Sequence, residues 1–113
     1  MPDFEKLKKS WEFDLIFRTG VRINGYLVRI LYLKDEKISG VKFGCVVAKR
    51  LGKANVRNRG RRVMREAFRR LAKEYEIRSN TKIILSMKEK GLEVKTQEIY
   101  EELEKLFKRK NLI

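Results

Sequence analysis

The sequence predicts an α+β domain with the element order α-β-β-β-α-β-α, in which a central sheet and its helices form a two-layer sandwich. Three observations support this fold class. Residues 26–33 and 41–48 alternate in the manner of half-buried strands, and residues 57–75 repeat apolar side chains at helical spacing. A further apolar run, residues 81–87, follows that helix. The length of 113 residues and the 42% apolar content suit one modest core, so we expect a single domain over residues 1–113.

Residues 10–19 predict a short helix. Ser10 is a candidate N-cap, and Gly20 stands where a left-handed residue would end the helix. The apolar side chains lie on two sides of this helix, with Phe13 and Phe17 together on one of them. Such a helix either packs between two layers or presents one side to a ligand, and the usual burial of phenylalanine favours packing for both rings.

The strands follow this helix. Residues 26–33 form the clearest one, after a shorter extended piece at residues 21–24. Residues 41–48 come after a polar turn, so we expect 26–33 and 41–48 to pair as antiparallel neighbours. The strand at residues 81–87 is reached through the long helix, and such a unit places its two strands in parallel. Alternation puts four side chains of the first long strand on one face: Tyr26, Val28, Ile30 and Tyr32.

Residues 96–110 predict a closing amphipathic helix. Acids paired with lysines at helical spacing indicate a solvated outer face, and basic residues at the end complement the helix dipole. The core-facing stripe consists of Ile99, Leu103, Leu106 and Phe107.

Positive charge is concentrated in residues 49–73. This segment holds eleven Lys and Arg residues against one acid, Glu66, and supplies +10 of the formal net charge of +14. Such a surface repels itself unless a polyanion lies against it. Because an ordinary solvated helix face mixes both signs, we expect nucleic acid as the partner. RNA is favoured over DNA, since no tight helix-turn-helix corner precedes a recognition helix.

The long helix separates packing residues from charged residues. On a helical wheel the packing face contains Val63, Met64, Ala67, Phe68, Leu71 and Tyr75. The charged face contains Asn58, Arg61, Arg62, Arg65, Arg69 and Lys73. Guanidinium groups held in such an array favour bidentate contacts with phosphates. Gly60 falls within the packing face and costs about 1 kcal/mol relative to Ala. Either the helix begins later than residue 57, or another backbone approaches Gly60 closely.

Several kinds of site are excluded or disfavoured. The chain has no His, so it lacks the usual neutral-pH general base and the usual zinc ligand. Its acids form no obvious cluster for metal-dependent nuclease chemistry. Cys45, the only cysteine, lies in an apolar run, which favours a buried strand residue over a reactive thiol. Because no apolar run approaches the roughly 18 residues that span a bilayer and the first residues lack a secretory signal, we expect a cytoplasmic protein without membrane contact.

The basic segment also contains an ordered motif. Its members are Lys49-Arg50, Gly52, Lys53-Ala54, Arg57-Asn58-Arg59, Arg61-Arg62 and Arg65-Glu66-Ala67-Phe68. In this order the residues closely resemble the signature of the protein subunit of bacterial ribonuclease P. The resemblance extends over nearly the whole chain, because that family also opens with a short helix carrying two Phe residues four apart. Gly60 departs from the family, which usually has a branched apolar residue at this place.

The resemblance implies a fold like that of ribosomal protein S5 domain 2. In this family the connection between the strand before the basic helix and the strand after it is a left-handed crossover. General rules favour a right-handed crossover in about 98% of such units, so here the resemblance overrides the rule.

The resemblance also implies a function. The protein would be an accessory subunit of an endoribonuclease, monomeric within a ribonucleoprotein, in which a catalytic RNA, the RNase P RNA, removes the 5′ leader of precursor tRNA. Magnesium ions would be held mainly by the RNA, and the protein would have no catalytic residue. The implied contacts with the catalytic RNA are Lys49, Arg50, Lys53, Arg57, Asn58, Arg59, Arg61, Arg62, Arg65 and Arg69. A cleft between the first helix and the sheet would hold the leader, with Phe13, Phe17, Tyr32 and Lys49 as its residues.

Two other functions remain open at this point. A ribosomal or RNA-chaperone protein would bind structured RNA without joining an enzyme, and a small DNA-binding protein would prefer duplex DNA. The order of the motif, rather than the charge alone, favours the ribonuclease P subunit.

Overall fold

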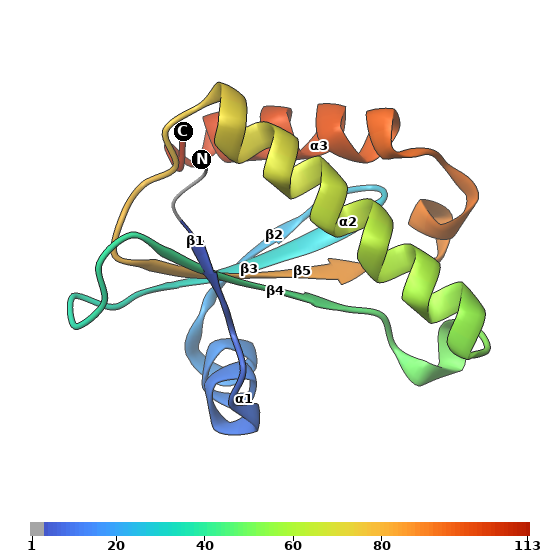
Figure 1. Cartoon of the computed structure of the whole chain (residues 1–113), viewed down its shortest axis with the longest axis horizontal. Coiled ribbons are helices and arrows are strands. Elements are labelled where there is room, and N and C mark those ends of the chain that lie inside the picture. The colour runs from blue at the N-terminus through green and yellow to red at the C-terminus, as the bar shows by residue number, and fades with distance from the viewer. Residues whose placement is uncertain (1–3) are drawn as a thin grey trace.

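The structure, a computed structural model, describes residues 4–113, which form a five-stranded sheet with helices on both of its faces (Figure 1). The strands are β1 (Phe4–Lys6), β2 (Val21–Asn24), β3 (Val28–Lys34), β4 (Val41–Val46) and β5 (Thr81–Met87). The α-helices are α1 (Ser10–Thr19), α2 (Ala54–Glu74) and α3 (Thr96–Arg109), and two short 3-10 helices are η1 (Lys49–Leu51) and η2 (Glu89–Glu93). The strand order is β1-β4-β5-β3-β2. The α+β fold class predicted from the sequence is confirmed, and α1 adds a third layer, on the second face of the sheet, to the two layers predicted.

β5 lies at the centre of the sheet and corrects the predicted pairing. β4 and β5 are parallel, as predicted, but β3 pairs with β2 and β5 instead of with β4. The predicted antiparallel pairing of residues 26–33 with residues 41–48 is therefore wrong. Six of the seven residues of β5 are buried. A strand that is apolar on both faces needs cover on both, and the centre of the sheet provides it because helices lie over both faces there.

Residues 4–6, for which no element was predicted, form β1 at the edge of the sheet. β1 runs parallel to β4, with Phe4 opposite Val41. The Phe4 ring packs edge-on against Phe43 and Phe68, at centroid distances of 5.9 and 5.1 Å. Three residues are too few for alternation to be recognised, so this strand depends on tertiary packing.

α2 and α3 cover one face of the sheet and α1 covers the other (Figure 1). In the larger core, under α2 and α3, the rings of Phe43 and Phe68 stack with their centroids 3.7 Å apart. The chain passes from β4 through α2 to β5 by the left-handed crossover that the resemblance implies (Figure 1). The smaller core, under α1, consists of Leu7, Ile16, Leu31 and Ile84.

α2 begins earlier than predicted and includes Gly60. The helix starts at Ala54, and Gly60 is buried in its packing face. A Cβ atom at Gly60 would lie 3.1 Å from Val47 Cγ2 and 3.3 Å from Leu92 Cδ2. Both explanations offered for this glycine are therefore wrong: the helix does not begin later, and the close neighbours are side chains, not another backbone.

The ends of α1 also differ from the prediction. Ser10 is the first helical residue, and the capping position is held by Lys9, which makes no side-chain cap. Gly20 has φ −74° and ψ 163°, so it is extended rather than left-handed. A Cβ atom on Gly20 would lie 2.6 Å from the Ile16 carbonyl oxygen. The glycine is thus required by close packing against the last turn.

None of the helices within residues 4–113 combines the length and the apolarity that crossing a bilayer requires.

A buried ion cluster anchors α1 to the sheet. The Nζ atom of Lys82, on β5, lies 3.0 Å from Glu12 Oε2 and 3.1 Å from Asp35 Oδ2. The side chains of Glu12 and Lys82 are only 6% and 5% exposed. Lys42 Nζ lies 3.7 Å from the same Glu12 oxygen. Because a buried charge without a partner is strongly destabilising, this cluster fixes where α1 can sit.

The cluster shifts the pKa values of its members. Burial raises the pKa of Glu12, but the hydrogen bond and charge of Lys82 lower it more, and the net pKa lies below the ordinary 4.5. Burial lowers the pKa of Lys82, whereas its bonds to Glu12 and Asp35 raise the net pKa above 10.5. The contribution of Glu12 to stability is thus present above pH 4.5 and is lost as the pH falls through the lowered pKa. That of Lys82 is lost only as the pH rises through its own raised pKa.

Replacing Glu12 with Gln should lower the free energy of unfolding by about 2 kcal/mol at neutral pH. This value lies between those of exposed pairs and of fully buried pairs, since Lys82 keeps Asp35 as a partner. Urea unfolding of both proteins across the acid range checks it. The difference between wild type and variant should shrink below pH 4.5, where wild-type Glu12 also becomes protonated.

Glu36→Gln is the matched control, because Glu36 pairs with Lys34 at 3.6 Å on the surface and is 81% exposed. It should leave the unfolding free energy nearly unchanged. A Glu12→Gln variant with the full acid sensitivity of the wild type would contradict the assignment.

Candidate nucleic-acid interface

A row of four arginines runs along one side of α2. Arg57, Arg61, Arg65 and Arg69 are spaced four residues apart, so successive members lie about 6 Å apart along the helix axis. The first three are half-buried and Arg69 is exposed. Their aliphatic stems pack at the edge of the helix while the charged groups reach the surface. We call these four residues the arginine row.

No carboxylate within residues 4–113 forms an ion pair with the arginine row. Arg61 donates a hydrogen bond to the side-chain oxygen of Asn58. The buried Nε atom of Arg57 has no hydrogen-bond acceptor among these residues. Glu66, the only acid of the basic segment, instead accepts a hydrogen bond from Thr96 on α3. The charge of the row is therefore available to an external anion.

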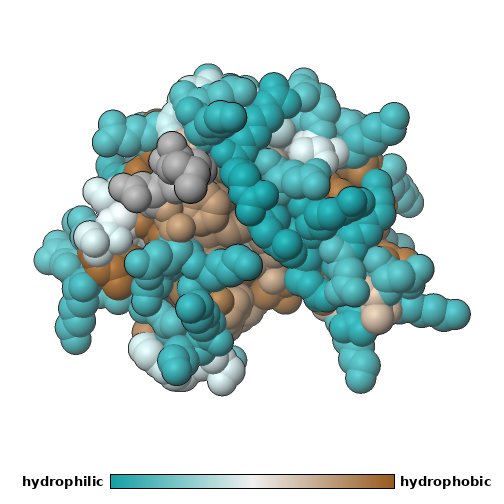
Figure 2. Space-filling model, viewed as in Figure 1, coloured by the Kyte–Doolittle hydropathy of each residue, from teal (hydrophilic) through white to brown (hydrophobic). Residues whose placement is uncertain are grey.

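The row borders an apolar hollow of about 220 Å³ between α2, β4 and α1. Arg61, Arg65 and Arg69 line one side, and the Phe13 ring lies at the other. Gly44 makes room for that ring, since a Cβ atom there would lie 2.7 Å from Phe13 Cζ. Figure 2 shows the hydrophilic residues along α2 beside an apolar strip over β1 and β4. The arrangement joins an apolar surface to a cationic one.

Cys45 is a half-buried residue of β4 that lines the same hollow. Burial raises the pKa of its thiol to about 12, although the charges of Arg65 and Arg61 act in the opposite direction. The thiol is half-buried in β4, and its raised pKa agrees with the prediction that it is not a reactive thiolate.

The predicted cleft residues are only partly brought together. Phe13 and Phe17 lie on one side of α1 and pack against the smaller core. Tyr32 packs against the larger core, on the opposite face of the sheet, so its placement in a cleft with the two phenylalanines is wrong. Its alternation with Leu31, a smaller-core residue, sets this face. Lys49 is exposed and is the first residue of η1, shortly after the end of β4.

The remaining predicted contacts lie on the outer side of the basic segment. All five are exposed, and all but Asn58 are cationic: Arg50, Lys53, Asn58, Arg59 and Arg62. The helical wheel therefore separates packing from charged residues as predicted, with Val63, Met64, Ala67, Phe68 and Leu71 buried.

A second basic groove was not found from the sequence. It has a volume of about 510 Å³ and is lined by Tyr26, Arg29, Arg50, Ser86, Lys88 and Lys90, with one acid, Glu89. Arg29 faces the same side of the sheet as Leu31, opposite Ser86 in the register. The signal that could have indicated it is Arg29 itself, a cation inside an apolar strand.

Glu102 on α3 holds the hairpin that borders this groove. Its carboxylate accepts hydrogen bonds from the backbone N–H groups of Tyr26, Leu27 and Val28 at 2.7 to 3.1 Å. Lys88 Nζ donates to the Gly25 carbonyl at 2.7 Å. The groove therefore has a fixed wall rather than a free loop.

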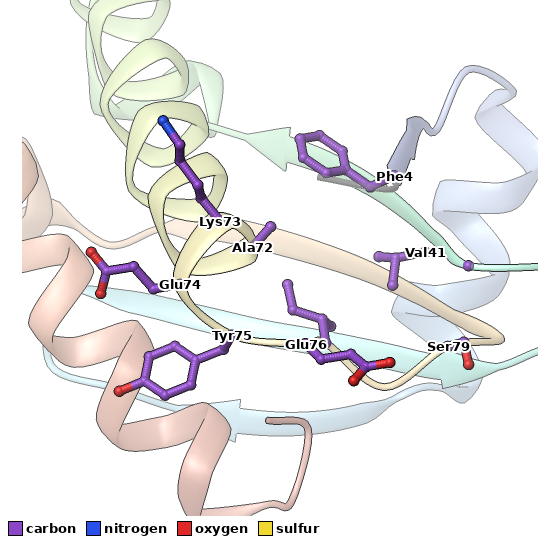
Figure 3. Close-up of a pocket in the computed structure, with 10 residues that line it drawn as sticks. Phe4, Val41, Ala72, Lys73, Glu74, Tyr75, Glu76 and Ser79 are labelled. Carbon is purple, nitrogen blue, oxygen red and sulfur yellow. The ribbon is translucent and has the colours of Figure 1, made fainter. Parts of the chain in front are cut away.

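Another hollow, of about 490 Å³, lies at the C-terminal end of α2 (Figure 3). Lys73 shares its lining with two acids, Glu74 and Glu76, and the side chains of Lys73 and Glu74 point away from Val41 in Figure 3. Its mixed charge does not suit a polyanion. No three His, Cys, Asp or Glu side chains converge as metal ligands anywhere in residues 4–113.

Comparison with known sequences decides the family. The family profile described as Ribonuclease P matches residues 1–111. The chain belongs to the ribonuclease P protein family. A ribonuclease P protein component of Fusobacterium nucleatum subsp. nucleatum is 33% identical over 111 residues, which are 95% of this chain and 97% of that protein. One from Thermoanaerobacter sp. strain X514 is 32% identical over 101 residues, 89% of this chain and 84% of that protein.

Solved structures of the family have the same fold. The RNase P protein from Thermotoga maritima is 30% identical and superposes with a TM-score of 0.79, covering 93% of this chain and 96% of that chain. The RNase P protein of Staphylococcus aureus superposes with a TM-score of 0.81 at 24% identity, covering 95% of each chain. At that identity the second likeness concerns the fold alone.

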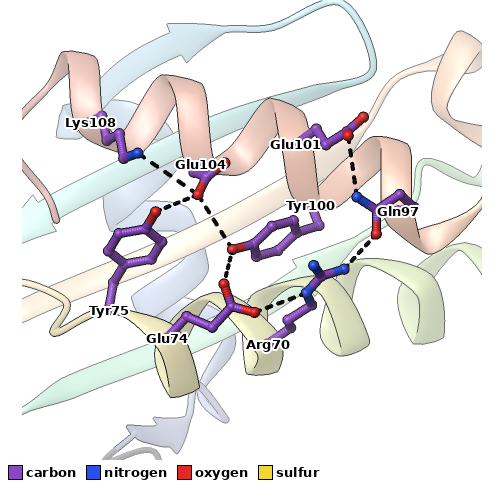
Figure 4. Close-up of polar contacts among 8 residues, drawn as sticks. All are labelled: Arg70, Glu74, Tyr75, Gln97, Tyr100, Glu101, Glu104 and Lys108. Carbon is purple, nitrogen blue, oxygen red and sulfur yellow. Dashed lines mark hydrogen bonds and ion pairs between the residues drawn. The ribbon is translucent and has the colours of Figure 1, made fainter.

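One arginine of this ribonuclease P family member serves the fold instead of the surface. Arg70 Nε lies 3.2 Å from Glu74 Oε1, and its guanidinium carbon lies 3.9 Å from the centre of the Tyr100 ring on α3 (Figure 4). Arg70 also donates to Gln97 at 2.5 Å. Tyr100 in turn donates to Glu74, and Tyr75 donates to Glu104. These contacts join α2 to α3.

Arg69 and Arg70, adjacent in the sequence, should therefore respond differently to replacement. Arg70→Ala should lower the free energy of unfolding by about 1 kcal/mol, because it removes the stacking on Tyr100. Arg69→Ala should leave stability unchanged or raise it slightly, since it removes repulsion within the arginine row. Urea unfolding of the two variants at low salt checks this, and equal losses of stability would contradict the division.

Proposed function

We propose that the chain is the protein subunit of a ribonuclease P that removes the 5′ leader from precursor tRNA, with an RNA subunit carrying the catalysis. The observation that carries the proposal is the arginine row, with which no carboxylate of residues 4–113 forms an ion pair. The row belongs to a chain of the ribonuclease P protein family. The names of the relatives describe protein components of ribonuclease P, and this chain spans most of their length.

The arginine row would bind the catalytic RNA together with the exposed cations of the basic segment. Its guanidinium groups are held by a helix whose opposite face is buried, so their spacing is fixed before the RNA arrives. Phosphate contacts from such groups release condensed counterions, and bidentate geometry adds directionality. Arg61 is oriented further by its bond to Asn58.

The 5′ leader would pass along the α1 face of the sheet. Phe13 and Phe17 are partly exposed there, and Phe13 borders the hollow that the arginine row lines. Aromatic rings stack on any base, and neighbouring arginines neutralise the backbone, so this surface would accept leaders of varied sequence. The basic groove with Arg29 and Lys88 lies on the same face and would extend the path.

Magnesium ions would be held mainly by the RNA. The charged side chains that line the two proposed RNA-binding surfaces are cationic, apart from Glu89 in the second groove. Their charge would repel a free divalent ion and attract the phosphates that carry it. The residues of this chain would therefore bind and orient RNA.

Reconstitution tests the proposal. The purified chain alone should cleave no precursor tRNA. Added to the large RNA that copurifies with it from native extract, at moderate magnesium concentration, it should restore leader removal. Recovery of the chain with ribosomal subunits, or a protein that leaves the substrate affinity of that RNA unchanged, would contradict it.

Replacing both Arg61 and Arg65 with Ala should weaken binding to the catalytic RNA about 100-fold at low salt, because two charged contacts are lost. The negative slope of log K against log salt should become shallower by about two units, one for each phosphate contact. Filter binding or anisotropy over a salt series measures both quantities.

Two controls separate this effect from others. Lys105→Ala with Lys110→Ala removes two exposed cations of the α3 segment and should leave the slope nearly unchanged. Phe17→Ala should spare binding to the catalytic RNA and reduce the preference for leader-bearing precursor over mature tRNA. If the arginine and Phe17 variants behaved alike, the assignment of separate roles would be wrong.

A further inference from the structure

A third basic surface surrounds Trp11, at the start of α1. Trp11 is 60% exposed. It borders a hollow of about 370 Å³ in which lysines outnumber carboxylates five to two. Lys6, Lys8 and Lys9 are exposed members of this lining. We call this surface the Trp11 patch.

The indole of Trp11 is held in place from beneath. Lys82 Nζ lies 5.4 Å from the centre of the ring, and Lys82 is fixed by its ion pairs with Glu12 and Asp35. The ring therefore has one side against a buried cation and leaves most of its surface to solvent. A single exposed apolar residue needs no explanation, but an exposed indole supported in this way inside a lysine cluster has the form of a stacking platform.

The Trp11 patch is continuous with the hollow beside the arginine row. Lys6 lines both hollows, on the two sides of the segment that connects β1 to α1. Of the two acids, Glu12 is buried against Lys82 and Lys42, whereas Glu5 is exposed and is outnumbered by the exposed Lys6, Lys8 and Lys9. The free charge of the patch is positive, which suits a phosphate backbone passing on from the arginine row.

We propose that the Trp11 patch binds a single-stranded RNA segment, with one base stacked on the indole and its neighbouring phosphates against Lys8, Lys9 and Lys42. This inference rests on the proposed RNA-binding function and adds a contact outside the arginine row and outside the surface of Phe13 and Phe17. An unpaired base is required, because a base inside a duplex cannot offer its face to the ring.

Fluorescence tests the proposal directly, because Trp11 is the only tryptophan of the chain. An eight-nucleotide oligouridylate should quench the Trp11 emission of the full-length protein. Inorganic polyphosphate, which offers charge without bases, and duplex RNA of equal length should bind with little quenching. Anisotropy of a labelled oligouridylate should show about tenfold weaker binding by Trp11→Leu and an intermediate loss for Trp11→Phe.

Val21→Ala is the matched control, since Val21 is 47% exposed and lies outside the patch. This variant should change neither the quenching of Trp11 emission by oligouridylate nor the affinity for oligouridylate. Unchanged affinity of a folded Trp11→Leu variant would overturn the proposal, as would equal quenching by polyphosphate or emission that depends on protein concentration without RNA. None of these outcomes affects the arginine row, whose role is decided by the salt dependence of Arg61→Ala with Arg65→Ala.

Discussion

The structure depends on the packing of one helix that is apolar on one side and strongly cationic on the other. α2 buries Val63, Met64, Ala67, Phe68 and Leu71 against the sheet, and the stack of Phe68 on Phe43 lies at the centre of that contact. This burial must outweigh the repulsion among the cations on the outer side, because no carboxylate within residues 4–113 forms an ion pair with the arginine row. The same packing that stabilises the fold therefore holds the charges in a fixed array, and an RNA would remove the remaining repulsion.

The opposite face of the sheet is organised by a polar interaction. Glu12 and Lys82 are almost fully buried, and a buried pair of this kind contributes less to stability than to specifying one arrangement. Here the arrangement is the position of α1. Because Glu12 and Phe13 are adjacent, the ion pair that fixes the helix also sets Phe13 over Gly44 and beside the arginine row. Lys82 supports Trp11 from the same place, so one cluster positions two aromatic surfaces.

The sequence predicted the elements that have long periodic patterns and missed features set by tertiary contact. The packing face of α2 and the stripe of α3 were predicted because both repeat over several turns. The predicted pairing of β3 with β4 was wrong. Two strands that follow each other in the sequence usually form a hairpin, but here the apolar β5 lies between them. Tyr32 was misplaced although alternation assigned it to the face of Ile30, because the family motif does not fix strand register and the register decides the face. The groove at Arg29 needs β3, β5 and the hairpin together, and Gly60 is explained by Val47 and Leu92, which no local pattern indicates.

The exposure of the cations suggests how affinity is divided among the three basic surfaces. Arg57, Arg61 and Arg65 are half-buried, so their stems have already lost rotamer freedom and little more is lost when they bind phosphate. Lys6, Lys8 and Lys9 of the Trp11 patch are exposed, and each must lose rotamer freedom on binding. The arginine row should therefore supply most of the binding free energy and fix the register of the RNA. The aromatic surfaces, which gain from stacking on any unpaired base, would then distinguish single strands from duplexes.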